Sequence, residues 1–111
     1  MVPEDRSVVW VHGRIHSPPF SKAARVEAGN LIRRLQEGER LGMPASRPMP
    51  SIGSRCHELR ISDASTSWRI VYRLDPDAVA VLAVFEKKTR RTPFHVIHAC
   101  RLRLQRYEEE R

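Results

Sequence analysis

Three apolar segments in the second half of the chain constrain the fold more than any other feature. They are CHELRI (56–61), SWRIVYRL (67–74) and AVAVLAVFE (78–86), and each shows either period-two alternation or the β-branched content of strands. The separators SDAST and DPD are short and consist of turn-forming residues. Because strands joined by such short turns run antiparallel, the sequence predicts an antiparallel meander over residues 56–86.

The first half of the chain predicts one further strand and a helix. Residues 8–11 form a short apolar run of the kind found in strands inside a sheet. From Phe20 to Leu35, apolar residues recur at spacings of three and four, which indicates an amphipathic helix. A helical pair that turns at Gly29 and Asn30 is an alternative. The residues that bound the two elements are Gly13, Pro18, Pro19, Gly38 and Gly42.

A connecting loop and a second helix complete the expected order of elements. Residues 43–53 contain three prolines, which favours a loop. After the meander, Thr92 and Pro93 are typical of the N-cap and first position of a helix. Its expected apolar face consists of Phe94, Ile97, Cys100, Leu104 and Tyr107. The expected fold is therefore α+β, with a mostly antiparallel four-stranded sheet packed by an N-terminal helix or helical pair and a C-terminal helix.

The length and composition are those of one small domain. With 111 residues and 41% apolar content, the chain can build a single modest core, so residues 1–111 are expected to form one domain. No run approaches the roughly 18 apolar residues of a membrane span, and the N-terminus lacks the pattern of a signal peptide. We therefore expect no membrane association and a cytoplasmic location, where Cys56 and Cys100 would be free thiols.

The charge balance points to a polyanionic partner. The formal net charge is +7, from 20 Lys and Arg against 13 Asp and Glu, and all but three of these cations are arginines. Arginine presents a planar fork of donors that suits phosphate and can stack on bases, which favours nucleic acid. A bias of the coding sequence toward arginine, with the charges merely solvated, is the alternative.

Two arginines of the meander are expected to face each other. In the first two strands Arg60 and Arg69 alternate with apolar residues, so they point away from the core. If the turn pairs Ile61 with Trp68, Arg60 lies directly opposite Arg69. Like charges at such positions repel, and a bridging phosphate would satisfy both. The alternative is that each arginine pairs with a carboxylate, such as Glu58 or Asp63.

A cationic segment follows the last strand of the meander. The run FEKKTRRTP places four cations within five residues, just before the expected helix N-terminus, which itself favours anions. Its members are Lys87, Lys88, Thr89, Arg90 and Arg91. Such a run is often only a solvated loop. Its place at the end of a buried strand, beside the paired arginines, instead predicts phosphate contacts.

Several other polar residues are further candidates for the site. Arg73 and Tyr72 are reserve site residues, although Tyr72 is expected to pack inward. His57 borders the arginine pair and is a candidate phosphate ligand, but strict alternation points it toward the core. His95 and His98 are three residues apart, a spacing that metal ligands can use, yet no third ligand is evident. We therefore expect no metal and no cofactor.

The order of these motifs resembles a known family. The run RPMPSIGSRCHELRI, the strands WRIVYRL and AVLAVFEKKT and the terminal TPFHVIHACRLRLQRY are similar to phage-derived, HigB-type toxins of the RelE/ParE superfamily. The resemblance covers residues 43–107. It departs from the usual pattern in a shorter N-terminal half, in Trp68 where tyrosine is frequent, and in Glu86 within the cationic motif.

This resemblance implies a compact RelE-like toxin acting on RNA. It implies a metal-independent, ribosome-dependent endoribonuclease that cleaves messenger RNA, monomeric when free and neutralised by a helix-turn-helix antitoxin of the HigA type. Carried over by position, Arg60, Arg69, Lys87 and Lys88 would be catalytic, and Thr89 would bind RNA. Two alternatives stay open: a ParE-like inhibitor of DNA gyrase on the same fold, and a non-catalytic homologue that acts only in a repressor complex.

Overall fold

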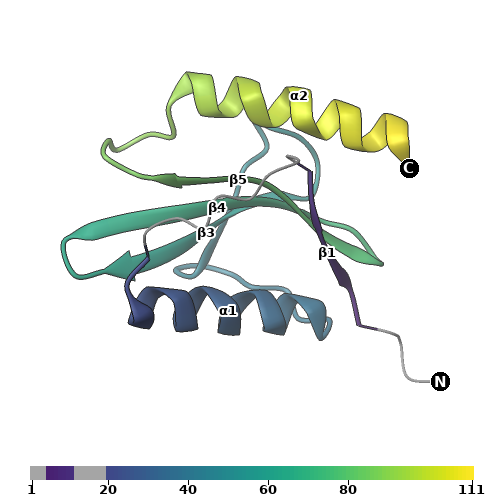
Figure 1. The fold of residues 1–111 in the computed structure, drawn as a ribbon. Coiled ribbons are helices and arrows are strands. Elements are labelled where there is room, and N and C mark those ends of the chain that lie inside the picture. The colour runs from purple at the N-terminus through teal and green to yellow at the C-terminus, as the bar shows by residue number, and fades with distance from the viewer. Residues whose placement is uncertain (1–4, 12–19) are drawn as a thin grey trace.

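The chain folds into three layers, with a central sheet between two helices (Figure 1). A computed structural model describes residues 5–11 and 20–111. The helix α1 covers one face of the sheet and α2 covers the other. The elements in chain order are β1 (Ser7–Trp10), α1 (Lys22–Gln36), β2 (Ser46–Pro48), β3 (Cys56–Asp63), β4 (Thr66–Leu74), β5 (Ala78–Glu86) and α2 (Phe94–Glu110).

The sheet contains the predicted meander but has five strands. Strands β3, β4 and β5 pair antiparallel in sequence order, as expected. The strand order is β1-β5-β4-β3-β2, and β1 pairs parallel with β5, so the sheet is mixed. The prediction of an interior first strand was wrong, because β1 lies at the edge. Val8 and Val9 still pack against the two opposite core clusters, which explains its apolar sequence.

The fifth strand lies in the segment that was expected to be a loop. Residues Ser46–Pro48 pair antiparallel with Leu59–His57 at the other edge of the sheet. A proline lacks the backbone N–H that a central strand must donate, but an edge strand tolerates it. The proline content of residues 43–53 therefore excluded a central strand and not an edge strand.

The first helix is continuous. Ser21 caps it, since its hydroxyl accepts a hydrogen bond from the Ala24 N–H. The helix runs through Gly29 without interruption, so the alternative of a helical pair is wrong. Its buried face consists of Ala24, Ala28, Leu31 and Leu35. The expected boundary residues Gly13, Pro18 and Pro19 lie outside the described residues.

Two glycines near this helix give a matched test of the fold. A Cβ at Gly29 would meet no atom within 4 Å, whereas Gly38 has a φ of +102°. We expect Gly29→Ala to raise the free energy of unfolding by about 0.5–1 kcal/mol, because alanine is the better helix former. Gly38→Ala should lower it by roughly 1–2 kcal/mol, because a side chain is strained at positive φ. Urea unfolding measures both, and equal effects of the two variants would contradict the helix assignment.

The C-terminal helix differs at its start from the expectation. It begins at Phe94 after Pro93, and Thr92 makes no capping bond. Phe94 is 72% exposed, so it is not part of the apolar face. The residues that α2 buries are Val96, Cys100, Leu104 and Tyr107. Among the described residues, neither helix has the length and apolar character needed to cross a membrane.

Candidate functional site

The two arginines of the meander occupy the predicted positions. Ile61 pairs with Trp68, and Arg60 lies directly opposite Arg69. Trp68 and Ile61 belong to the core beneath α1. Strict alternation therefore places Arg60 and Arg69 on the other face of the sheet, the face on which α2 packs.

A buried carboxylate lies at the centre of this face. Glu58 is fully buried, and its Oε1 lies 3.3 Å from Nε of Arg69 and 3.7 Å from Nζ of Lys87. Its Oε2 accepts a hydrogen bond of 2.7 Å from the hydroxyl of Thr92. A buried carboxylate needs such partners, because desolvation without them is very costly. Thr92, predicted to cap α2, instead fixes Glu58.

Four cations surround this one carboxylate. Arg47 of β2 pairs with Glu58 across the sheet, and Arg60 precedes the β-turn on the same face. Within residues 5–11 and 20–111, neither Arg47 nor Arg60 has a salt-bridge partner. We call Arg47, Glu58, Arg60, Arg69 and Lys87 the Glu58 cluster. Its positive charge exceeds what Glu58 can neutralise, so the cluster attracts an anion.

The Glu58 cluster also shifts the titration of Lys87. Burial lowers the pKa of this amine, since its side chain is only 7% exposed, and the charges of Arg69, Arg47 and Arg60 lower it further. Glu58 opposes the shift. Neighbouring cations therefore contribute to the lowered pKa of Lys87, but burial is its main cause. A lysine with a lowered pKa can exchange protons more readily near neutral pH.

Arg69 is held firmly within the cluster. One guanidinium nitrogen donates to the hydroxyl of Ser67 at 2.6 Å and to the carbonyl of Trp68 at 2.9 Å. Its Nε lies near Glu58 without the alignment of a hydrogen bond. The carboxylate alternative considered for Arg69 is thus correct, with Glu58 as the partner. Asp63 is not a partner of either arginine; it accepts a hydrogen bond from the Ser21 N–H.

The cationic segment after β5 extends the site toward solvent. Lys87 directly follows the last residue of β5, and its N–H donates to the carbonyl of Ser67 at 2.7 Å. The residues that follow are exposed up to Thr92, and Thr89 donates its hydroxyl to the carbonyl of Arg91. The exposed members are Lys88, Thr89, Arg90 and Arg91. They lie between a cluster residue, Lys87, and the threonine that fixes Glu58.

Two predicted site residues lie elsewhere. Arg73 is only 6% exposed, and its guanidinium binds Asp75 and Glu108 beneath the end of α2. It was expected to contact phosphate, and this is wrong, because its donors are used internally. His57 lies on the α1 face and stacks on Tyr72, with ring centroids 5.4 Å apart. Tyr72 packs inward, as expected, and its hydroxyl is 2.7 Å from that of Ser46.

Sequence reasoning missed three members of the site: Arg47, Glu58 as its centre, and Thr92 as the residue that fixes Glu58. Arg47 was missed because its segment was taken for a loop. Glu58 shares its strand face with Arg60, and this alternation was the available signal. A charged residue in that position is either exposed or the centre of a buried ion cluster.

The two thiols are unsuited to chemistry. Cys56 and Cys100 are free and buried in the core beneath α2. Burial raises the pKa of Cys56 to about 11 and that of Cys100 to about 12. Both are therefore protonated at neutral pH, and a protonated thiol is a poor nucleophile and a poor metal ligand.

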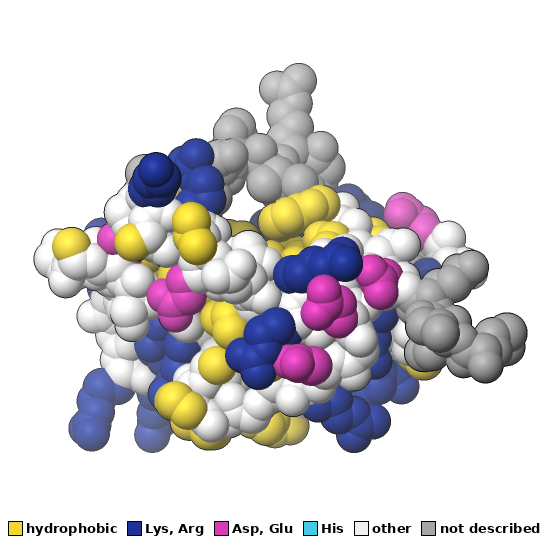
Figure 2. All heavy atoms as spheres, turned by 90° about the horizontal axis from the view of Figure 1, so that it is seen from below, with side chains coloured by type: hydrophobic (Ala, Val, Ile, Leu, Met, Phe, Trp, Pro, Cys, Tyr) yellow, Lys and Arg dark blue, Asp and Glu magenta, His cyan; other side chains and the backbone are white. Residues whose placement is uncertain are grey.

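The chemistry that the Glu58 cluster can perform is stabilisation of a phosphate. Arg47 and Arg60 offer guanidinium groups that have no carboxylate partner in the described part of the chain, Arg69 is fixed in place, and Lys87 can donate or accept a proton. The opposite side of the molecule differs. Figure 2, which views the α1 side, shows acidic and basic side chains interspersed there. On α1 itself, Arg33 forms an ion pair with Glu37.

Comparison with known proteins gives one family. The family model described as "Phage derived protein Gp49-like (DUF891)" matches residues 19–105. Neither the curated proteins nor the solved structures give a significant match. The matched range contains the whole Glu58 cluster and the cationic segment after β5.

Proposed function

The chain belongs to the Gp49-like phage-derived protein family, a RelE/HigB-like toxin family, and we propose that it is the toxin of a type II toxin–antitoxin module. We propose further that it is of the HigB type and cleaves messenger RNA on the ribosome as an endoribonuclease. The observation that carries this proposal is the Glu58 cluster, in which the cations outnumber the carboxylate.

The cluster matches the demands of RNA cleavage. In this reaction the 2′-hydroxyl loses a proton and attacks phosphorus, the 5′-oxygen leaves and gains a proton, and negative charge develops on the phosphorane. Arg60 and Arg69 stabilise that charge. Lys87, whose pKa is lowered mainly by burial, is the proton-transfer group, with Lys88 as the exposed alternative.

The remaining polar residues have supporting roles in this proposal. Glu58 orients Arg69 and Lys87 and is too buried to reach a substrate. The exposed cations Arg90 and Arg91, together with Thr89, bind the RNA backbone on either side of the cleaved bond. Because backbone contacts release counterions, the affinity for RNA falls steeply with salt.

The proposed partner is a helix-turn-helix antitoxin. A strongly basic toxin favours a partner with an acidic or amphipathic element, which would neutralise the charge of its RNA-binding surface. The protein also exposes large apolar side chains, including Val26, Met43 and Leu102, which a partner can cover. Binding of this kind would keep the toxin inactive within the module.

The test of the proposed function is to map the 5′ ends of cellular RNA after induced expression in a bacterial host. We expect growth arrest and new ends inside translated messages, which disappear when ribosomes are blocked. Arg60→Ala should abolish both effects, because Arg60 has no salt-bridge partner within the described residues and is free to bind phosphate. Arg25→Ala, which changes an exposed arginine on α1, is the matched control and should remain toxic.

Each other outcome identifies an alternative. Growth arrest with gyrase inhibition and no new RNA ends would replace the proposal with a ParE-like activity. The absence of arrest from a folded, expressed protein would indicate a non-catalytic homologue. New ends that persist in Arg60→Ala would keep a nuclease but remove the Glu58 cluster as its site.

A further inference from the structure

A cavity lies apart from the Glu58 cluster, on the α1 side of the sheet. Its volume is about 500 Å³, within the range of small-molecule sites. It is formed where β3 begins and β4 ends, beside the residues that follow α1. Its wall includes His57, whose neighbour Glu58 points to the opposite face of the sheet. None of the cations of the Glu58 cluster lines this cavity.

Three arginines give the cavity a positive charge. Arg6 is held rigidly, because it donates to the carbonyls of Asp75 and Leu35 at 2.8 and 2.9 Å. These acceptors are neutral, so the charge of Arg6 is not cancelled. Arg40 is exposed and makes no salt bridge within the described part of the chain. Arg55 lies at the rim, with one nitrogen 3.0 Å from Asp75.

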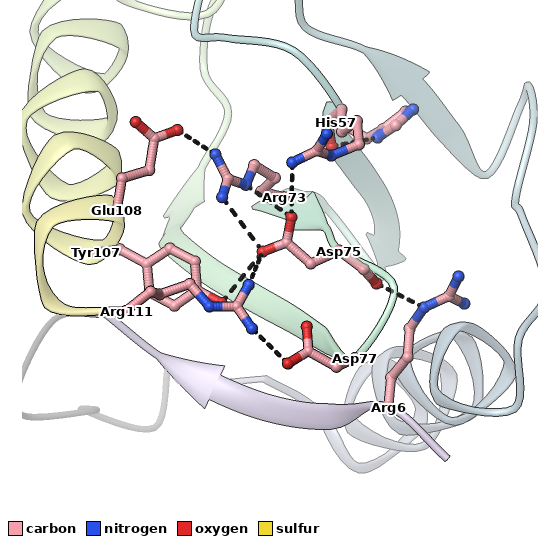
Figure 3. Close-up of polar contacts among 9 residues, drawn as sticks. Arg6, His57, Arg73, Asp75, Asp77, Tyr107, Glu108 and Arg111 are labelled. Carbon is pink, nitrogen blue, oxygen red and sulfur yellow. Dashed lines mark hydrogen bonds and ion pairs between the residues drawn. The ribbon is translucent and has the colours of Figure 1, made fainter. Parts of the chain in front are cut away.

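The one carboxylate in the wall does not neutralise these arginines. The oxygens of Asp75 also bind the buried Arg73 and the terminal Arg111, and they accept a hydrogen bond from Tyr107. Figure 3 shows Arg73, Arg111 and Tyr107 turned toward Asp75, while Arg6 reaches its backbone carbonyl. Two arginines outside the cavity thus share the charge of Asp75, and the cavity keeps its positive excess.

The backbone at the rim is held in an unusual conformation. Arg55 has a φ of 60°, a region that residues other than glycine rarely adopt. Its carbonyl accepts from the Leu74 N–H at 2.9 Å and lies 3.1 Å from Nδ1 of His57. Strained backbone of this kind is concentrated at binding and catalytic sites. Here it directs the Arg55 side chain over Asp75 and fixes the His57 ring.

The rest of the cavity lining is mainly apolar and aromatic. It contains Leu41, Leu74, Pro76 and the His57 ring, which stacks on Tyr72 at an interplanar angle of 22°. Burial, followed by the charge of Arg40, lowers the pKa of His57 against the effect of its hydrogen bond to Arg55. The imidazole is therefore neutral at pH 7 and offers a planar surface rather than another cation.

We propose that this cavity is a second binding site, which takes a nucleoside 5′-monophosphate, with the phosphate on Arg6, Arg40 and Arg55 and the base against the apolar wall. Arginine forks recognise phosphate, and the apolar side chains with the stacked rings of His57 and Tyr72 suit a base. The nucleotide can be free or can be the 5′-phosphorylated end of an RNA chain, because both present the same chemistry. This site is independent of the proposed nuclease activity.

The test is calorimetric titration of the folded protein with AMP, inorganic phosphate and adenosine. We expect saturable binding of AMP at one site, with phosphate and adenosine at least about tenfold weaker, because each makes only part of the contacts. Arg40→Ala and His57→Ala should each weaken the binding of AMP about tenfold or more. Arg25→Ala, on the exposed side of α1, is the control for a general loss of positive charge, and Arg60→Ala controls for binding at the Glu58 cluster.

The outcomes separate the sources and the alternatives. Tighter binding of a 5′-phosphorylated oligonucleotide than of its 5′-hydroxyl form, with the difference lost in Arg40→Ala, supports recognition of an RNA end; binding of AMP without such a difference supports a free nucleotide. The proposal is overturned if AMP does not saturate, if phosphate binds as tightly as AMP, or if Arg60→Ala abolishes binding while Arg40→Ala and His57→Ala retain it.

Discussion

Replacing Asp75 with alanine is expected to lower the free energy of unfolding by about 3–5 kcal/mol. The Asp75 side chain is 1% exposed and binds Arg55, Arg73 and Arg111. Without it, the buried Arg73 keeps Glu108 as its one ionic partner among the residues that the structure describes, and a buried charge that loses its partner is strongly destabilising. A domain of this size is stable by roughly 5–15 kcal/mol, so the loss is a large fraction of the total.

The Asp75 variant should also loosen one particular part of the fold. Tyr107 and Arg111 bind Asp75, and Glu108 binds Arg73, so these contacts hold the C-terminal end of α2 against the sheet. Urea unfolding measures the global loss, and hydrogen exchange should show reduced protection concentrated in the last turns of α2. Asp77→Ala is the matched control: Asp77 also binds Arg111 but is 68% exposed, so its loss should change the free energy of unfolding far less than the loss of Asp75. Equal effects of the two variants would mean that burial of the Asp75 network adds nothing.

The sequence was informative where period and turn length decide the structure. The register of Arg60 opposite Arg69 follows from a short turn and strict alternation, both of which are local properties. Alternation also placed Tyr72 in the core. The edge strands were not predictable in the same way. An edge strand is defined by which neighbour it lacks, and for β1 that depends on pairing with β5, some seventy residues later.

The centre of the candidate site was harder to predict for a different reason. Glu58 is stable in the core only because Arg69, Lys87 and Thr92 converge on it. These partners come from β4 and from the connection between β5 and α2, and Thr92 is 34 residues away. Local pattern assigned Thr92 to the helix cap, since its chemistry suits a cap equally well. In the folded protein, the hydrogen bond to the buried Glu58 carboxylate outweighs a capping bond to α2.

The same convergence alters what an arginine variant should show. Removing Arg69 takes away a proposed phosphate ligand and also leaves the buried Glu58 with Lys87 as its one remaining ionic partner in the described residues. Removing Arg60 takes away a cation that has no carboxylate partner in the described residues, and it relieves repulsion across the strand pair. The two variants should therefore be alike in activity and unlike in stability.

Arg69→Ala is expected to reduce single-turnover cleavage of a message on programmed ribosomes by about 10²–10³-fold, as the loss of one phosphorane-stabilising group does. It should also lower the free energy of unfolding by about 1–3 kcal/mol, because Glu58 is less well compensated. Arg60→Ala should lose a similar factor in rate while its stability to urea stays unchanged or rises slightly.

Arg69→Lys separates the two roles of Arg69. It keeps a cation near Glu58, so the free energy of unfolding should largely return to that of the wild type. A single ammonium group cannot replace the guanidinium fork, so cleavage should stay at least about tenfold slower than in the wild type. Cleavage by Arg60→Ala at the wild-type rate would show that the arginine pair does not act on the phosphate. Full recovery of the rate in Arg69→Lys would mean that charge alone, and not the shape of the guanidinium group, is what the reaction requires at this position.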